Sequence, residues 1–319
     1  MNRWDCRREY TAASLHDVPP NSAPHKPVQT VPRQIWREGG SSVGSRSIPE
    51  ETAVAVTYNG GTYAVMMATP QDLRDFAVGF SLSEGVIDSL ADIDSLDIVR
   101  LDDGVELRIW LSKPRADRLR DRRRHIAGPT GCGLCGIESI AEALRPAAII
   151  GCDREFSAEH IMAAMRHLPP LQKINIETRA VHAAAFWDVA RGIVALREDV
   201  GRHNALDKLA GALAQEPVAA SEGIILLTSR ISVEMVQKSA AIGASVMVSV
   251  SAPTALAVRM ANAAGITLVA IARADGFEVF THPWRISLGA AVANADLAGA
   301  RSPGALHNLT AQCLHLPAG

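Results

Sequence analysis

Two cysteines stand two residues apart in the run Gly131-Cys132-Gly133-Leu134-Cys135-Gly136. Such a pair brings two sulfur atoms within reach of each other, so that it can exchange a disulfide, hold a metal ion, or carry a sulfane sulfur that one thiol accepts and the other helps to release. The surrounding glycines favour a mobile loop that could move between a donor and an acceptor. We therefore expect the chemistry of this chain to centre on Cys132 and Cys135.

Other readings of the cysteine pair compete with a sulfur carrier. Disulfide exchange is disfavoured because no βαβ pattern of the thioredoxin type surrounds the pair. A structural zinc ion needs four ligands, and without a second C-x-x-C motif His182 would be at most the third. A zinc deaminase would need a glutamate two residues after the histidine, but position 184 is alanine. A purely structural pair stays open, and we expect no metal ion of the protein's own.

An arginine-dense segment directly precedes His125 and the cysteine pair. Nearby cations favour a thiolate, so that the segment could lower the thiol pKa and hold an anionic cofactor or partner. Its spacing fits equally well an exposed helix face on which Asp117 and Asp121 pair with arginines. The segment holds Arg115, Arg118, Arg120, Arg122, Arg123 and Arg124.

Composition limits the classes of protein that the chain can belong to. Its 319 residues, 48% of them hydrophobic, fit one large or two ordinary folded domains. The formal net charge of -2 gives no global field that would attract nucleic acid or an anionic membrane. Five scattered cysteines favour a reducing compartment, and we find neither a signal peptide nor a run of the roughly 18 apolar residues of a membrane span. We expect a cytoplasmic protein that binds neither nucleic acid nor a membrane.

The sequence divides into four parts. Residues 1–45 mix prolines, glycines, serines and charges without periodicity, which predicts a flexible N-terminal extension. Residues 46–128 predict a small α+β domain, since alternating apolar residues flank a hairpin turn at Asn59-Gly60 and a helix follows. Residues 129–140 are the predicted C-x-x-C loop, and residues 141–319 are the predicted larger domain.

The larger domain alternates between short apolar strands and helices. Crossovers this short imply parallel neighbours in a sheet that helices cover. We predict an α/β fold, a three-layer α/β/α unit with a mixed sheet, beside the smaller N-terminal α+β domain. The predicted strands span 181–187, 192–197, 223–228, 246–250 and 266–271, and the predicted helices span 205–213, 232–241 and 254–264.

Polar residues follow the three predicted parallel strands. Ligands of open parallel sheets bind outside the carboxyl ends of the strands, and helices that begin there would aim free backbone N–H groups at an anion. Arg230 and Arg273 would add charge, although the serines in these segments could merely cap helices and form turns. The sequence predicts a nucleotide or phosphate site with Ser229, Arg230, Ser251, Arg273, Ala274, Asp275 and Gly276.

A second polar cluster runs from Arg197 to Asn204, between a strand and a helix. Asn204 could cap the helix, and the charges could form a solvated connection. His203, flanked by Arg202 and Asp199, could instead donate to an anion or move a proton.

Several stretches together resemble one protein family. They are GCGLCG at 131–136, EDVGRHNALDK at 198–208, SRISVEMVQK at 229–238, SVSAPTALAV at 249–258 and THPWRI at 281–286, with ATPQDLRDFAVGFSLSEG at 68–85. The chain resembles the FdhD/NarQ family, the formate dehydrogenase accessory sulfur carriers, over roughly residues 48 to 290.

This resemblance implies a function, a fold and partners. A cysteine persulfide would take sulfane sulfur from a cysteine desulfurase and pass it to bis-molybdopterin guanine dinucleotide, which is then inserted into formate dehydrogenase. The main domain would be similar to the cytidine deaminase fold, and the protein would be a homodimer. Cys132 and Cys135 fall on the sulfur-transfer loop of the family, with Cys132 favoured as the carrier. The guanine-nucleotide-binding strand end of the family falls on Ile271, Ala272, Arg273, Ala274, Asp275 and Gly276.

Two alternatives to a sulfurtransferase remain at this point. One is a non-catalytic chaperone that only presents the cofactor to formate dehydrogenase. The other is a zinc-dependent hydrolase related to deaminases, which would hold about one zinc ion per chain.

Overall fold

The computed structural model describes residues 26–126 and 145–289, with the side chains of 121–126 left out. Residues up to Ser287 form one compact unit, and Leu288–Gly319 form a second, of which only two residues are described. The predicted larger domain spans residues 141–319, and its part beyond residue 289 lies outside the described residues. The predicted loop at 129–140 lies outside the described residues.

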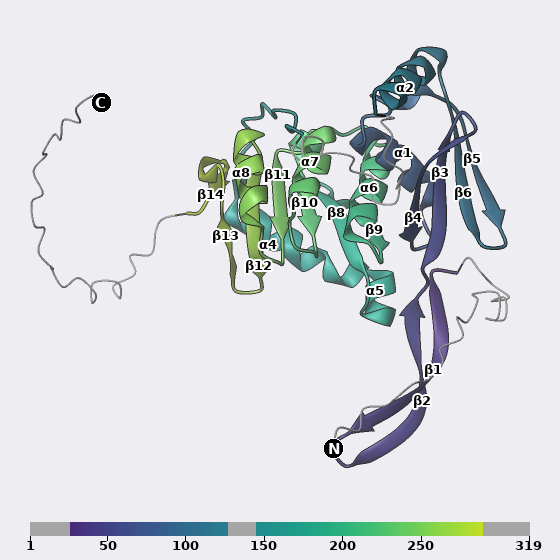
Figure 1. The fold of residues 1–319 in the computed structure, drawn as a ribbon. Coiled ribbons are helices and arrows are strands. Elements are labelled where there is room, and N and C mark those ends of the chain that lie inside the picture. The colour runs from purple at the N-terminus through teal and green to yellow at the C-terminus, as the bar shows by residue number, and fades with distance from the viewer. Residues whose placement is uncertain (1–25, 127–144, 290–319) are drawn as a thin grey trace, which may run out of the picture. The chain divides into compact units, whose positions relative to one another are not determined.

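A mixed sheet of six strands forms the centre of the larger region (Figure 1). Its order is β13-β12-β11-β10-β8-β9, in which β10, β11 and β12 are parallel and the other pairings are antiparallel. Each predicted strand is present, within about two residues of its predicted ends. The strands are β8 (His182–Asp188), β9 (Gly192–Asp199), β10 (Ile224–Leu227), β11 (Val246–Ser249), β12 (Thr267–Arg273) and β13 (Gly276–Val279).

Helices cover both faces of this sheet, which confirms the three-layer prediction. On one face Leu227 and Met247 belong to the same core as buried side chains of α6 (Arg202–Leu213), α7 (Val233–Ala241) and α8 (Ala255–Ala263). On the other face Leu226 and Val248 share a core with α4 (Ala158–His167). The strands are apolar on both sides because both sides are buried, as in other parallel sheets.

A second sheet, of four strands in the order β4-β3-β6-β5, has its own core. Its strands are β3 (Thr52–Tyr58), β4 (Gly61–Ala68), β5 (Ile93–Leu101) and β6 (Gly104–Leu111), and α1 (Leu73–Ser83) packs against one face. The predicted hairpin turn joins β3 to β4, with positive φ at Asn59 and Gly60. Helix α2 (Lys113–Ile126) follows β6.

Helices α1 and α6 join the two sheets through a close contact between glycines. A Cβ atom added to Gly79 of α1 would lie 1.7 Å from the carbonyl oxygen of Asp207, and one added to Gly211 of α6 would lie 1.9 Å from that of Asp75. Only residues without a side chain allow two backbones to approach so closely. The predicted boundary near residue 128 therefore does not separate two loosely joined bodies.

The N-terminal hairpin corrects the prediction of a flexible extension for residues 28–45, while residues 1–25 lie outside the described residues. β1 (Val28–Arg37) and β2 (Gly40–Pro49) pair along their whole length as a two-stranded ribbon. Proline is rare in central strands because its nitrogen cannot donate a hydrogen bond to a neighbouring strand. In a two-stranded ribbon, however, each strand has one edge without a neighbour. Pro32, opposite Ser45, is therefore tolerated in β1.

Three short elements complete the fold: α5 (Lys173–Thr178), β7 (Phe156–Ser157) and β14 (Ile286–Ser287).

Candidate functional site

The carboxyl ends of β10, β11 and β12 bring the predicted strand-end residues together. The Ser249 hydroxyl donates to the carbonyl oxygen of Ser229 at 2.6 Å and accepts from the backbone N–H of Ser251 at 3.1 Å. The N–H of Ile271 then points to the carbonyl oxygen of Ser251 at 3.4 Å. Ser249 thus links the first strand end to the second.

Ile271 has a backbone conformation that its residue type disfavours. Its φ is +52°, in the left-handed region, where a β-branched residue costs about 1–3 kcal/mol. The strand register shifts here, between Ala270 and Arg273, so that Ala270 and Ile271 both pack on the core beneath α6, α7 and α8, whereas Ala272 packs on the opposite core. Such bulges re-aim side chains beside functional sites.

The remaining residues of this predicted segment form the turn between β12 and β13. Arg273 pairs with Gly276, which leaves Ala274 and Asp275 as an exposed two-residue turn. Arg230 is exposed as well. Neither Arg230 nor Arg273 has an ion-pair partner among the described residues, so both guanidinium groups are available to an anion.

Two helices begin at this edge of the sheet, and a side chain of the helix start accepts a hydrogen bond from a free backbone N–H group in only one of them. Thr254, the N-cap of α8, accepts a hydrogen bond from the N–H of Ala257 at 3.2 Å. Ser232, the N-cap of α7, does not cap the helix, because its hydroxyl donates to Glu234 Oε2 at 3.1 Å. The start of α7 thus retains more unpaired N–H groups than the start of α8.

Asp199, in the polar run at 197–204, has a structural role. Asp199 and Lys208 form a fully buried ion pair, with 2.6 Å between Oδ2 and Nζ. The carboxylate also accepts the N–H of Gly201 at 2.7 Å and that of Thr69 at 3.0 Å, and Asn204 donates to it at 3.0 Å. Because Lys208 also donates to the carbonyl oxygen of Thr69 at 2.8 Å, this pair ties α6 to the end of β4.

A second buried pair, Asp207 with Lys238, ties α6 to α7. Lys238 Nζ lies 2.9 Å from Asp207 Oδ1, and Ser83 of α1 donates to the same oxygen at 2.6 Å. Burial, the largest single effect, lowers the pKa of Lys238, but the carboxylates of Asp207 and Glu84 together raise it above its usual value, and burial raises the pKa of Asp207. These charges stabilise the junction of three helices.

His203 and Glu234 form a polar pair at the same end of the sheet. His203 Nε2 lies 3.0 Å from Glu234 Oε2, and both side chains remain partly exposed. Burial and the neighbouring Arg202 lower the pKa of His203, which favours the neutral ring. With the carboxylate as acceptor, the proton lies on Nε2 and the lone pair on Nδ1 is left to accept a proton. The sequence indicated His203 but not Glu234, whose only signal was its position two residues after the N-cap of α7.

A second histidine of this region, His182, lies on β8 opposite Asp199. Burial, then the adjacent Arg202, lowers the pKa of His182. Arg202 Nε is itself buried and has no hydrogen-bond partner in the described part of the chain. Within that part no three metal-ligating side chains cluster, and the cysteines that could accompany His182 lie outside it.

Cys132 and Cys135 lie outside the described residues, but the chain on either side of them is placed. The described chain stops at the end of α2 and resumes at Arg145. The carbonyl oxygen of Arg145 accepts a hydrogen bond from Gln237 Nε2 at 2.8 Å. Gln237 follows Glu234 by three residues on α7, so it lies about one helical turn away. The described chain therefore resumes beside the helix that carries Glu234.

The arginine-dense segment is only partly available to a ligand. Arg115 is buried and pairs with Asp88 and Asp92, so it fixes α2 to the segment between α1 and β5. Arg120 pairs with Asp117 at 2.7 Å, as the helical spacing predicted. Arg118 stays exposed, 3.9 Å from Asp88. The side chains of Arg122, Arg123 and Arg124 are outside the described set.

Comparison with known proteins places these features in a family. The FdhD/NarQ family model matches residues 49–287, which include the cysteine pair and both polar clusters. The chain belongs to the FdhD/NarQ family. It is 51% identical to the sulfur carrier protein FdhD of Agrobacterium fabrum, over 81% of this chain and 96% of the relative. It is 49% identical to the sulfur carrier protein FdhD of Cupriavidus necator, over 81% of this chain and 90% of the relative.

A solved structure supports the fold of this FdhD/NarQ protein. The crystal structure of a protein described as a formate dehydrogenase accessory protein from Desulfotalea psychrophila aligns with a TM-score of 0.66. It is 25% identical and covers 82% of this chain and 100% of its own. The mixed α/β fold is thus shared, while the likeness to the cytidine deaminase fold stays a prediction.

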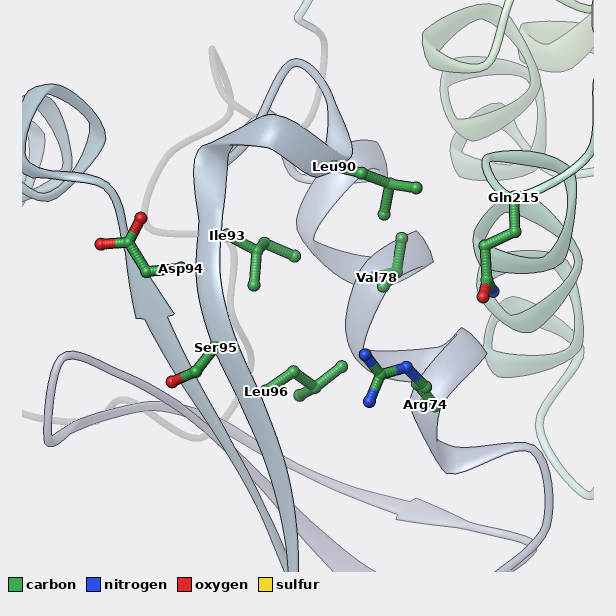
Figure 2. A pocket seen from close by; sticks show the side chains of 8 residues that line it. All are labelled: Arg74, Val78, Leu90, Ile93, Asp94, Ser95, Leu96 and Gln215. Carbon is green, nitrogen blue, oxygen red and sulfur yellow. The ribbon is translucent and has the colours of Figure 1, made fainter.

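Figure 2 shows a hollow of about 220 Å³ between α1 and β5 that holds none of the predicted site residues. Arg74 points toward apolar side chains there, and the carboxylate of Asp94 points away. The lining residues are Arg74, Val78, Leu90, Ile93, Asp94, Ser95, Leu96 and Gln215.

Among the described residues, no helix has the length and apolar character needed to cross a membrane.

Proposed function

We propose that this protein is a sulfurtransferase that takes sulfane sulfur from a cysteine desulfurase as a cysteine persulfide and transfers it to bis-molybdopterin guanine dinucleotide. Formate dehydrogenase would need the sulfurated cofactor for activity. The observation that carries the proposal is the C-x-x-C pair within a segment whose relatives are named sulfur carrier proteins. Its cysteine usage suits a reducing compartment, and we propose that it acts in the cytoplasm, as a homodimer.

The loading step needs one thiolate. The thiolate of Cys132 attacks the outer sulfur of the desulfurase persulfide, an S–S bond breaks, and the desulfurase thiolate leaves. One new S–S bond forms on this chain, so that no external oxidant is required. Exposed Arg118, together with the arginines that follow it, supports this step because cations favour the thiolate.

The release step uses the second thiol. When the thiolate of Cys135 attacks the inner sulfur of the persulfide, a disulfide between Cys132 and Cys135 forms and the outer sulfur leaves as hydrosulfide. The two electrons that reduce the sulfur come from the two cysteines. His203 Nδ1 is suited to take the proton of the attacking thiol, since Glu234 holds the proton of the ring on Nε2.

The strand ends suit the guanine nucleotide part of the substrate. Arg230 and Arg273 are exposed without ion-pair partners in the described structure, and Arg202 Nε is buried without a hydrogen bond. A buried polar atom without a partner costs roughly 1–3 kcal/mol, which a phosphate oxygen would recover. These groups fit a polyanion, and we propose that they bind the nucleotide phosphates of the substrate.

Mass spectrometry of the intact protein tests the carrier role. The protein is incubated with a cysteine desulfurase and cysteine, and wild type is compared with Cys132→Ala and Cys135→Ala. We expect a gain of about 32 Da per sulfur atom in wild type, lost in the variant that lacks the carrier thiol. Cys152→Ala is the matched control, because Cys152 is a half-buried free thiol outside the motif. No gain in wild type would refute the proposal.

A cell-based assay separates the carrier from a cofactor chaperone. A Cys132→Ala/Cys135→Ala double variant replaces the chromosomal copy, and formate dehydrogenase activity is measured. A carrier needs a thiol, so we expect the activity to be lost while guanine nucleotide binding is retained. Full activity in the double variant would establish the chaperone instead.

A further inference from the structure

The hollow between α1 and β5 holds the guanidinium group of Arg74 (Figure 2). Arg74, in the first turn of α1, is exposed, and it forms neither an ion pair nor a hydrogen bond with any residue that the structure describes. Its side chain points toward the apolar residues of the hollow. A guanidinium group carries five N–H donors in a planar fork that matches a carboxylate. Within the described structure, the hollow therefore presents an unpaired cation beside an apolar surface.

The two carboxylates nearest to Arg74 in the sequence are bound by other groups. Asp75 Oδ2 lies 2.6 Å from Arg197 Nη2, and Asp75 Oδ1 accepts a hydrogen bond from Gln215 Nε2 at 2.8 Å. Asp72 Oδ2 lies 3.8 Å from Arg197 Nε. Arg197, and not Arg74, is thus the cation that these two carboxylates bind, so that Arg74 stays available to a ligand.

A β-bulge in β5 directs a third carboxylate, that of Asp94, out of the hollow. The register between β5 and β6 shifts between Ile93 and Ser95, which leaves Asp94 as the additional residue. In a regular strand, residues three apart face opposite sides of the sheet. The bulge instead lets Ile93 and Leu96 pack on the same core, while the Asp94 carboxylate points away (Figure 2). Bulges that re-aim side chains in this way are common beside functional sites.

Aliphatic side chains form the rest of the wall. Val78 of α1 is only 3% exposed, whereas Leu90, which begins the short helix η2 (Leu90–Asp92), is 38% exposed. Ile93 and Leu96 of β5 complete the apolar surface. The volume of the hollow is about 220 Å³. At roughly 30 Å³ for a group the size of a water molecule, it has room for about seven non-hydrogen atoms.

We propose that this hollow binds a small aliphatic carboxylate, with its carboxylate on Arg74 and its hydrocarbon chain against the aliphatic wall. A guanidinium group binds a carboxylate through two parallel, charge-assisted hydrogen bonds. An inorganic anion would satisfy Arg74 but would leave the aliphatic wall facing water, whereas a short branched chain covers it. None of the residues to which we assign sulfur transfer or nucleotide binding lines the hollow, so the proposal does not rest on either.

Saturation-transfer NMR of the full chain, titrated with 3-methylbutanoate, tests the site. This probe has about seven non-hydrogen atoms, and we expect saturable binding with a Kd of about 1 mM or below. Two matched compounds separate the two halves of the site. 3-Methylbutanamide keeps the shape without the charge, and acetate keeps the charge without the hydrocarbon chain. We expect each to bind about tenfold or more weakly, because each lacks one of the two contacts.

Variants of the lining residues complete the test. Arg74→Gln changes an exposed, unpaired side chain of the described structure, so the fold should be retained, and we expect the affinity for 3-methylbutanoate to fall about tenfold or more. Leu90→Ser should reduce the preference for 3-methylbutanoate over acetate. Arg166→Gln, at an exposed arginine of α4 that does not line the hollow, should bind as wild type does.

Three results would overturn the proposal. The first is the lack of saturable binding to wild type up to about 20 mM 3-methylbutanoate. The second is the same affinity in Arg74→Gln as in wild type. The third is acetate that binds as tightly as 3-methylbutanoate, since an exposed guanidinium group without an apolar pocket would then explain the binding.

Discussion

Glu234 Oε2 lies 3.0 Å from His203 Nε2, and the same oxygen accepts the Ser232 hydroxyl at 3.1 Å. The carboxylate is thereby fixed at the start of α7, and it fixes the tautomer of the histidine at the start of α6. A neutral imidazole oriented by a carboxylate is a general base arrangement that recurs on unrelated folds.

The rate of sulfur release should depend on this pair. We expect Glu234→Gln to slow hydrosulfide release from the persulfide-loaded protein by about tenfold, and His203→Gln by about 100-fold. Loading by the desulfurase, followed by mass, should not change. Equal rates in wild type and His203→Gln would show that the proton goes elsewhere.

The pH dependence of release should follow the lowered pKa of His203. The ring accepts a proton only when neutral, so the rate should fall as the pH drops through a value below the ordinary 6.5. Glu234 raises that pKa, so Glu234→Gln should move this acid limb to lower pH. An acid limb in the same place for both proteins would contradict the assigned contact.

The free energy of unfolding should decrease in mild acid because of His182. Burial lowers its pKa in the folded state, so as the pH falls below 6.5 the unfolded chain takes up a proton before the folded chain does. The free energy of unfolding therefore decreases across that interval, and it should depend less on pH in His182→Gln. Urea denaturation of wild type and His182→Gln at pH 7.5 and at lower pH values measures this dependence. The same dependence in both proteins would contradict the prediction.

The buried pair Asp199–Lys208 should behave as a unit. Lys208→Met leaves a buried carboxylate without its cation, and we expect a loss of about 3–5 kcal/mol. Asp199→Asn in the same chain removes that charge, so the double variant should be more stable than the sum of the single changes predicts. Urea denaturation of all four proteins gives the coupling, and additive losses would show that the pair is not coupled.

Gly79→Ala tests the helix contact. The added Cβ meets the backbone of Asp207, which cannot rotate away, so α1 and α6 must separate. We expect a loss of about 3 kcal/mol, at the upper end for overpacking. Gly151→Ala is the control, because nothing lies within 4 Å of a Cβ at that position.

Guanine nucleotide binding should require the strand-end arginines. We expect Arg230→Ala and Arg273→Ala each to weaken binding of guanosine diphosphate by about tenfold, since each removes a charge-assisted contact. Arg259→Ala, exposed on α8, serves as the control in the same calorimetric titration. Unchanged affinity in both strand-end variants would place the nucleotide elsewhere.

The sequence predicts much of the fold because its signals are local. β10, β11 and β12 are short apolar runs between glycines and helix caps, and each was found within about two residues. The β1–β2 ribbon was missed because Pro32 and a serine-rich strand suggest disorder, and neither strand alternates regularly between apolar and polar residues.

The candidate site was less predictable, for reasons of burial. The run at 198–208 shows five charged residues, but the sequence cannot tell that Asp199 and Lys208 are enclosed while His203 faces outward. The positive φ of Ile271 was equally hidden, because nothing about isoleucine favours it. Both properties arise from elements far apart in the chain.

The glycine contact between α1 and α6 restricts how this protein can move. Closure of two domains, by a hinge or by the sliding of packed helices, needs an interface that can open or slide. Here backbone touches backbone at Gly79 and Gly211, and two buried ion pairs lie in the same junction, so opening it would expose uncompensated charge. Domain closure between the two sheets is therefore disfavoured, because it would break the contact between these two helices.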